Sequence, residues 1–403
     1  MFVNGQTTER TIRSIEELAE TFGRRATVFL RWGEVHVHLV EMGRSLSGVV
    51  AASPIAVDMG KVAEAMSAIS DACDGVLSPA ALRSRVAAID RMASVSLARF
   101  AIMAAAGAAA LGVIFGAADL LTTLVIVATA GVGACLRRAV GQRTDNPFAQ
   151  PFCAALLAGF VGTMTARLHL NLDPGLVVAC PCMVLVPGPH LLNGTIDLLR
   201  GRIAIGFARV AFAGLIVLAI SAGLLIGLSV GGISLPAMAA SKPAPLVEDV
   251  VAAGVAVAAY GSFFSMPWRL LPIPVTIGMV AHASRWLIIS TGRGGVVTGA
   301  LLACLIVGTI VAPASHRLRM PFAALAFASV VSLVPGVFLF QMAGGLVAVA
   351  ARGPAAPGDL LPGAVSNAIS AFLIMLAMTV GVIVPKMFID HFWYSGHIPK
   401  PRP

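Results

Sequence analysis

The sequence predicts an α-helical polytopic membrane protein. We expect about ten transmembrane helices, arranged as two inverted five-helix repeats, and a small N-terminal α/β cytoplasmic domain. The 403 residues are 58% hydrophobic and only 12% charged, with a mean hydropathy of +0.90, whereas a soluble surface needs more charge. Apolar runs from Leu97 onward are each close to the ~20 residues that a bilayer requires. A Val-Pro-Gly interruption also occurs twice, at matching places.

Residues 1–96 predict the cytoplasmic α/β domain. Its segments are a helix over 9–21, an alternating strand over 25–40, an amphipathic helix ending at Gly75, and a further helix. Ser78 and Pro79 start that last helix, because Ser is a favoured N-cap and Pro fits the first turn. The domain precedes the first apolar run, so we expect it at the membrane surface.

The remaining chain divides into apolar spans. We expect a first five-span membrane domain at 97–240, a second at 241–390, and a cytoplasmic tail at 391–403. The approximate spans are 98–118, 120–136, 150–168, 174–194, 204–229, 246–266, 270–290, 295–314, 319–341 and 361–389. Several are short or run together, so nine or eleven spans stay open.

The basic residues indicate the orientation. Residues 1–96 carry a net charge of −1 and the rest of the chain +10, as single Lys and Arg residues between apolar runs. With the N-terminus inside, thirteen of them fall on the inner side and five on the outer. This is the positive-inside pattern of a multi-pass protein with both termini in the cytoplasm. A nucleic-acid site would cluster its charge instead, so the expected partner is the lipid bilayer.

The two interruptions suggest an internal repeat. "LVPGPHLLNG" (185–194) is echoed by "LVPGVFLFQM" (333–342), in the fourth span of each half, and Pro187-Gly188 lies 148 residues before Pro335-Gly336. An odd number of spans per half inverts the second half. Broken helices at matching places in inverted repeats point to a secondary transporter. The alternative is chance recurrence in a Pro- and Gly-rich chain.

Polar residues follow the first break closely. Asn193 and Asp197 lie four residues apart on one helical face, where a carboxamide and a carboxylate can jointly hold an ammonium group or a proton. The amides of a half-helix starting at Gly188 could bind a carboxylate. Arg209 lies deeper in an apolar run, and either binds substrate or pairs with Asp197. In the second copy the polar residue after the break is Gln341.

Other polar residues have plainer interpretations. Arg200 and Arg202 are expected to mark the cytoplasmic boundary. His190 and His282 lie near span ends, where an interfacial histidine is expected and a proton relay is the minority interpretation. Most acidic residues beyond residue 100, Asp249 included, are expected to be solvated at span ends.

No Ser/His/Asp set, zinc motif or nucleotide loop is apparent in the spans, so we expect no enzyme and no cofactor. Cys180-Pro181-Cys182 resembles the intramembrane motif of copper-pumping ATPases, but it lies in a Val/Leu-rich run. Packing is therefore favoured over a metal site.

The run from Pro187-Gly188 through Asn193, Asp197-Leu198 and Gly201 resembles the core motif of the threonine/serine exporter family. "LSPAALRSRVAAI", "GSFFSMPWRLLPIPVTIGMVAHASRW" and "VVSLVPGVFLF" extend the similarity from about residue 10 to 390. Family members usually begin with a longer first helix. Only Glu9-Arg10 corresponds to it here, which leaves that helix's role undecided.

The resemblance implies a bacterial inner-membrane antiporter that exports threonine and serine, driven by the proton motive force. Its partners would then be a small amino acid and protons. Split-chain relatives are linked to dicarboxylate export, so the substrate stays open, as does assembly into homo-oligomers. The competing classes are a membrane enzyme and a non-transporting channel or scaffold.

Overall fold

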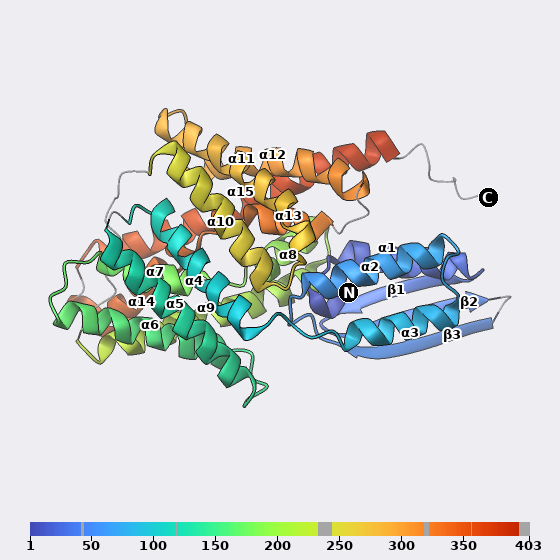
Figure 1. Cartoon of the computed structure of the whole chain (residues 1–403), viewed down its shortest axis with the longest axis horizontal. Coiled ribbons are helices and arrows are strands. Elements are labelled where there is room, and N and C mark those ends of the chain that lie inside the picture. The colour runs from blue at the N-terminus through green and yellow to red at the C-terminus, as the bar shows by residue number, and fades with distance from the viewer. Residues whose placement is uncertain (42–43, 118, 233–243, 318–321, 356, 395–403) are drawn as a thin grey trace.

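The computed structural model describes residues 1–41, 44–117, 119–232, 244–317, 322–355 and 357–394. It consists of a small α/β domain and a larger bundle of helices, with the domain projecting from one end of the bundle (Figure 1). The expected domain limits at 240 and 241 and the tail from residue 395 lie outside the described residues.

The N-terminal domain is a three-stranded antiparallel sheet in the order β1-β2-β3 with three helices. Thr7, Asp58 and Ser78 cap the three helices by accepting a backbone N–H with their side chains. The elements are η1 (Phe2–Asn4), α1 (Thr8–Thr21), β1 (Arg25–Arg31), β2 (Gly33–Glu41), β3 (Arg44–Ala52), α2 (Met59–Cys73) and α3 (Pro79–Asp90).

The prediction of a single strand over 25–40 is wrong. The chain turns at Gly33, whose φ of +96° favours glycine, and continues as β2 paired with β1 from Arg31 opposite Glu34. Apolar alternation continues across this short turn and hides it. The strand β3 was not predicted, and nearly all of its residues are exposed.

The bundle confirms the polytopic membrane fold. Eight described helices are each long and apolar enough to cross a membrane, and two bent helix pairs bring the total to ten. The single helices are α4 (Leu97–Ile114), α5 (Leu120–Gly141), α6 (Ala149–Arg167), α9 (Ile203–Ser229), α10 (Leu246–Phe263), α11 (Pro272–Ser290), α12 (Val296–Arg317) and α15 (Leu360–Tyr394). The bent pairs are α7 (Pro174–Met183) with α8 (Gly188–Leu199), and α13 (Phe322–Val330) and η3 (Val331–Leu333) with α14 (Gly336–Arg352).

The two broken spans lie at the expected places and run longer than expected, to Leu199 and Arg352. Their arms bend by 63° and 50°. In Figure 1, α8 and α13 lie toward the N-terminal domain, and α7 and α14 lie toward the opposite end. The arm near the domain comes second in the first pair and first in the second pair, which is the order that inverted repeats produce.

Glycines let neighbouring helices approach closely, as is common in membrane bundles. A Cβ at Gly223 on α9 would lie 2.3 Å from the Phe152 carbonyl oxygen of α6, and one at Gly159 would lie 2.3 Å from the Leu224 carbonyl oxygen. Both neighbours are backbone atoms, so only glycine fits without moving a helix.

The N-terminal domain is tied to the bundle by backbone contacts. The Met59 amide donates to the Phe264 carbonyl at 2.8 Å. At Gly60 a Cβ would lie only 2.8 Å from the Ser265 carbonyl oxygen. Ile205 of α9 packs with Phe2 in the domain core. The domain therefore packs directly against the ends of α9 and α10.

Substitution of Gly223 tests this close packing. We expect Gly223→Val to separate α6 and α9 and to lower the free energy of unfolding by about 1–3 kcal/mol or more. Gly214→Val is the matched control on the same helix, because a Cβ there meets nothing within 4 Å. Thermal unfolding of the purified variants in detergent measures the difference, and equal stability of the two variants would contradict the packing.

Candidate functional site

The two helix breaks meet in the interior of the bundle. A Cβ on Gly188 would lie 3.1 Å from the Phe327 ring and 3.4 Å from Val334. A Cβ on Gly336 would lie 3.3 Å from Val186. The lack of a side chain at each glycine therefore lets residues of the other broken span pack closely against it. Pro187 and Pro335 directly precede these glycines as the N-cap residues of α8 and α14.

A small cavity lies at this crossing. It has a volume of about 10 Å³, roughly the space of one water molecule. Its lining includes Gly188, Gly336, Tyr260 and Ser332. The Tyr260 hydroxyl donates to the Met183 carbonyl oxygen at 2.9 Å, near the end of α7, where helix carbonyls lack intrahelical partners. The Tyr260 side chain therefore supplies a hydrogen-bond donor to a backbone carbonyl beside the break.

A buried carboxylate lies further along α8. Asp197 is 1% exposed. Its Oδ2 accepts a hydrogen bond from the Thr8 hydroxyl at 2.7 Å and lies 3.6 Å from Nη1 of Arg209. Its Oδ1 lies 3.6 Å from Nη1 of Arg202. A buried charge of this kind is tolerated only with such partners.

The local sequence brings Asp197 and Arg209 together. Gly194 and Gly206 face each other where α8 and α9 cross, and a Cβ on either would lie about 3 Å from the other's carbonyl oxygen. Asp197 lies three residues after Gly194, and Arg209 lies three residues after Gly206. The close crossing thus places the two charged side chains on facing turns, and the pairing left open by the sequence is present.

The start of the chain covers this site. Asn193 donates through Nδ2 to the Gly5 carbonyl oxygen at 3.0 Å. Arg209 donates through Nη2 to the Gln6 carbonyl oxygen at 3.4 Å and lies over the Phe2 ring at 5.4 Å. Asn193 and Asp197 therefore do not share one ligand in this structure. They bind different atoms of the segment from Gly5 to Thr8, which we call the N-terminal strap.

Several buried N–H groups in or next to the strap make no hydrogen bond. Among the described residues, Nε and Nη1 of Arg209 and Nε2 of Gln6 are buried and have no hydrogen-bond partner. Buried donors without partners are uncommon in folded proteins. An acceptor bound here, such as a carboxylate or water, would satisfy them.

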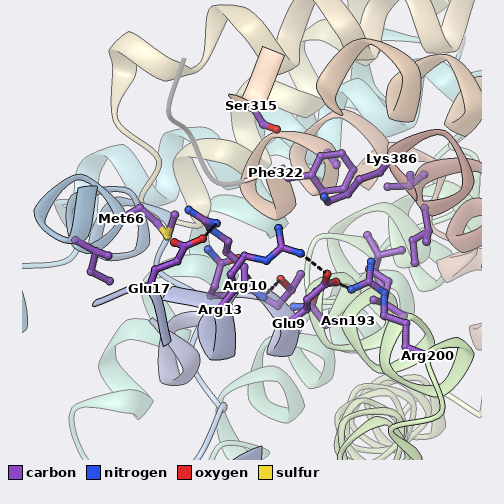
Figure 2. Close-up of a pocket in the computed structure, with 18 of the residues that line it drawn as sticks. Glu9, Arg10, Arg13, Glu17, Met66, Asn193, Arg200, Ser315, Phe322 and Lys386 are labelled. Carbon is purple, nitrogen blue, oxygen red and sulfur yellow. Dashed lines mark hydrogen bonds and ion pairs between the residues drawn. The ribbon is translucent and has the colours of Figure 1, made fainter. Parts of the chain in front are cut away.

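A larger cavity of about 260 Å³ opens beside the strap (Figure 2). Helix α1 contributes Glu9, Arg10 and Arg13 to its lining, and the Asn193 side chain reaches it from α8. Glu9 forms an ion pair with Arg200 across this cavity. The first helix, whose role the sequence left undecided, thus forms one wall of the site.

The other residues singled out from the sequence lie partly where they were expected and partly elsewhere. Arg200 and Arg202 do more than mark a boundary, since they pair with Glu9 and Asp197. Gln341 lies half-buried on α14 and lines none of the cavities described here. His190 is not interfacial as expected, because it is buried on α8 with its ring edge against Phe212 at 5.1 Å.

The structure contains a second buried polar cluster that was not predicted from the sequence. His282 on α11 is fully buried, with Nδ1 3.1 Å from Oδ2 of Asp249 and Nε2 2.8 Å from Oγ of Ser332. The expectation of a solvated Asp249 and an interfacial His282 is therefore wrong, as is the expectation that the spans hold no Ser/His/Asp set. The three residues come from α10, α11 and η3, so no linear motif reveals them. A lone ionisable residue in an apolar run was the available signal.

Comparison with known families covers most of the chain. Residues 1–231 match the threonine/serine exporter model ThrE, and residues 249–388 match a second model, "Threonine/Serine exporter, ThrE". The chain is also 33% identical over 103 residues to "Probable succinate transporter subunit YjjP" of Escherichia coli (strain K12), and 31% identical over 103 residues to the protein of the same name in Klebsiella aerogenes.

These two alignments cover 24% of this chain, and 39% and 38% of the respective relatives, so the chain spans less than two fifths of their length. No solved structure matches the chain.

Substitution of the two arginines that pair with Asp197 tests the site's electrostatics. Arg209→Met should cost about 3–5 kcal/mol of unfolding free energy, because it removes the fully buried partner of a buried carboxylate. Arg202→Met is the matched control and should cost about 1 kcal/mol or less, because its side chain is 30% exposed. Thermal unfolding in detergent compares them, and equal losses would show that Arg209 is not the principal partner of Asp197.

Proposed function

Because the chain belongs to the threonine/serine exporter family, we propose that it is a secondary transporter that exports threonine and serine in exchange for protons. In this proposal Asn193, Asp197 and Arg209 bind the amino acid. Export makes and breaks no covalent bond. The protein would lie in the bacterial inner membrane with both termini in the cytoplasm, as the distribution of basic residues favours.

The observation that carries this proposal is the pairing of Asp197 and Arg209 under the N-terminal strap. A zwitterionic amino acid carries one ammonium and one carboxylate. Asp197 offers an acceptor for the ammonium group, and Arg209 has two buried N–H groups, at Nε and Nη1, that make no hydrogen bond and suit the carboxylate. The Asn193 amide can bond to the substrate hydroxyl. Each substrate group therefore has a partner of matching chemistry.

The strap itself supports the choice of a hydroxy amino acid. The Thr8 hydroxyl donates to Asp197 at 2.7 Å, and the carbonyl of Gly5 accepts from Asn193. In the proposal the substrate ammonium replaces the Thr8 hydroxyl as the donor to Asp197, and the substrate hydroxyl oxygen replaces the Gly5 carbonyl as the acceptor from Asn193. In the proposal the strap occupies the positions of the substrate and is displaced when substrate binds from the adjoining cavity.

A dicarboxylate is the second candidate. Two observations favour it: the curated relatives are named as succinate transporter subunits, and Arg202 and Arg209 both lie at Asp197. Two cations could bind two carboxylates. The buried Asp197 would repel a dianion, however, so the zwitterion is the better match.

Counterflow of labelled threonine in proteoliposomes tests the site. The wild type should exchange threonine and serine in preference to succinate. Asp197→Asn should lower the exchange rate at least tenfold, because the ammonium partner is lost. Asn193→Ala should raise the half-saturating threonine concentration by about 2–12-fold, as expected for one hydrogen bond. Asp145→Asn, in an exposed loop, is the control. Preference for succinate, or exchange by Asp197→Asn at the wild-type rate, would contradict the proposal.

Thr8→Val tests the competition between strap and substrate. Removal of the hydroxyl that occupies Asp197 should lower the half-saturating threonine concentration by about tenfold or more, because one charge-assisted hydrogen bond no longer opposes binding. Thr21→Val on the same helix is the matched control, since its exposed hydroxyl bonds only within α1. A raised half-saturating concentration in Thr8→Val would mean that the strap assists binding instead.

A further inference from the structure

The cluster of Asp249, His282 and Ser332 has no part in the amino-acid site. We propose that it is the proton-carrying site of the transporter, with His282 taking up and releasing the proton. The inference rests on the proposed function, because it assigns a place to the proton that the exchange requires.

These three polar residues are buried, which costs free energy unless they have partners. Asp249 is 3% exposed, His282 is 0% and Ser332 is 8%. Ionisable residues within membrane spans are expensive, and they generally face partners inside the bundle. Here α10, α11 and η3 each contribute one polar side chain to one hydrogen-bonded row. The row therefore connects three separate elements through one imidazole.

The row can hold either protonation state of His282 without losing a hydrogen bond. In the neutral state Nδ1–H donates to the Asp249 carboxylate, and Nε2 accepts from the Ser332 hydroxyl. When Nε2 takes up a proton, it becomes a donor to the Ser332 oxygen, and the hydroxyl hydrogen rotates away. A serine can switch in this way because its oxygen both donates and accepts. The site thus suits reversible proton uptake.

Among the residues that the structure describes, the charges near His282 come from two elements. Asp249 lies on α10, and Arg285, on α11 itself, lies near enough to interact with both Asp249 and His282. The sequences of α13 and η3 contain no ionisable residue, and those of α12 other than Cys304 lie in its last turn, at 316 and 317. On α10, Glu248 is exposed and Tyr260 bonds to Met183.

With a neutral imidazole, the charges of Asp249 and Arg285 balance. Proton uptake adds one positive charge in a region of low dielectric, where it has a large effect. Conformations that differ in how they accommodate this charge would shift in population when the proton binds. The cluster can therefore couple protonation to a change of shape.

The position of Ser332 suggests which change that is. Ser332 lies three residues before Pro335 and lines the small cavity where the two breaks meet. The same cavity is lined by Gly188, the first residue of α8, which carries Asn193 and Asp197. A changed hydrogen bond at Ser332 therefore acts at the hinge of both broken helices, and α8 extends from that hinge to the amino-acid site.

The same row has the connectivity of a serine hydrolase triad, with Asp at Nδ1 and Ser at Nε2. A hydrolase must bring an ester or amide to the serine oxygen. The cavity at Ser332 has room for about one water molecule, so it can hold water beside this serine and is too small for an acyl group. Proton transfer is the role that the geometry favours.

His282→Gln tests the proposal in proteoliposomes of the full chain. Glutamine keeps hydrogen-bonding capacity but does not titrate. Threonine counterflow without a pH gradient should stay within about threefold of wild type, because exchange needs no net proton movement. Threonine accumulation driven by an imposed pH gradient should fall at least tenfold. Asp249→Asn is the second variant, with the same expected split. His169→Gln, at an exposed histidine, should match the wild type in both assays.

Three results would overturn the inference: full gradient-driven accumulation by His282→Gln, an equal loss of both readouts in His282→Gln and Asp249→Asn, or covalent labelling of Ser332 by a fluorophosphonate. The last would make the row a hydrolytic triad, with Ser332→Ala as the labelling control. A wild type without threonine counterflow would instead contradict the proposed function, and this inference with it. The wild-type and variant results thus separate the two failures.

Discussion

The Asp197 carboxylate links α8, its neighbour α9 and the N-terminal domain, which is almost two hundred residues away in sequence. It lies on α8, receives the Arg209 guanidinium from α9, and accepts the Thr8 hydroxyl from the N-terminal domain. A buried charge left without these partners would cost several kcal/mol, so the positions of all three elements are coupled. The close contact of Gly194 with Gly206, the contact of the strap with Asn193, and the place of α1 beside the cavity all accompany this arrangement.

The two polar clusters lie on either side of one crossing. Pro-Gly breaks allow two spans to bend where they meet, and Gly188 and Gly336 keep the gap between them small. From this crossing α8 leads to Asp197, while Ser332 connects through His282 to Asp249. A site for the amino acid and a site for the proton can thus communicate through a shared hinge. The polarity is unequal between the halves: in the first half an ion pair follows the break, and in the second half Ser332 precedes the break and connects it to His282 and Asp249.

Much of this architecture could be predicted from the sequence, because span lengths, Pro-Gly breaks and the placement of basic residues can each be recognised within a short segment. Asp197 and Arg209 were recognisable as isolated charges in apolar surroundings. The contacts with Gly5 and Thr8 were not, because they join residues almost two hundred positions apart. Asp249 and Ser332 lie 33 and 50 positions from His282. Each looked like an ordinary residue until helix packing brought the three together. The turn at Gly33 was hidden for a local reason, since apolar alternation continues from β1 into β2.

The central claim is that substrate replaces the strap at Asp197. Hydrogen–deuterium exchange of the full chain in detergent, with and without saturating threonine, measures this directly. We expect faster exchange in the N-terminal strap, which leaves the site, together with slower exchange in α8, which binds the amino acid. Glycine serves as the comparison, because it lacks the hydroxyl and should produce a smaller change. Unchanged exchange in both segments under saturating threonine, or protection of the strap, would contradict the claim.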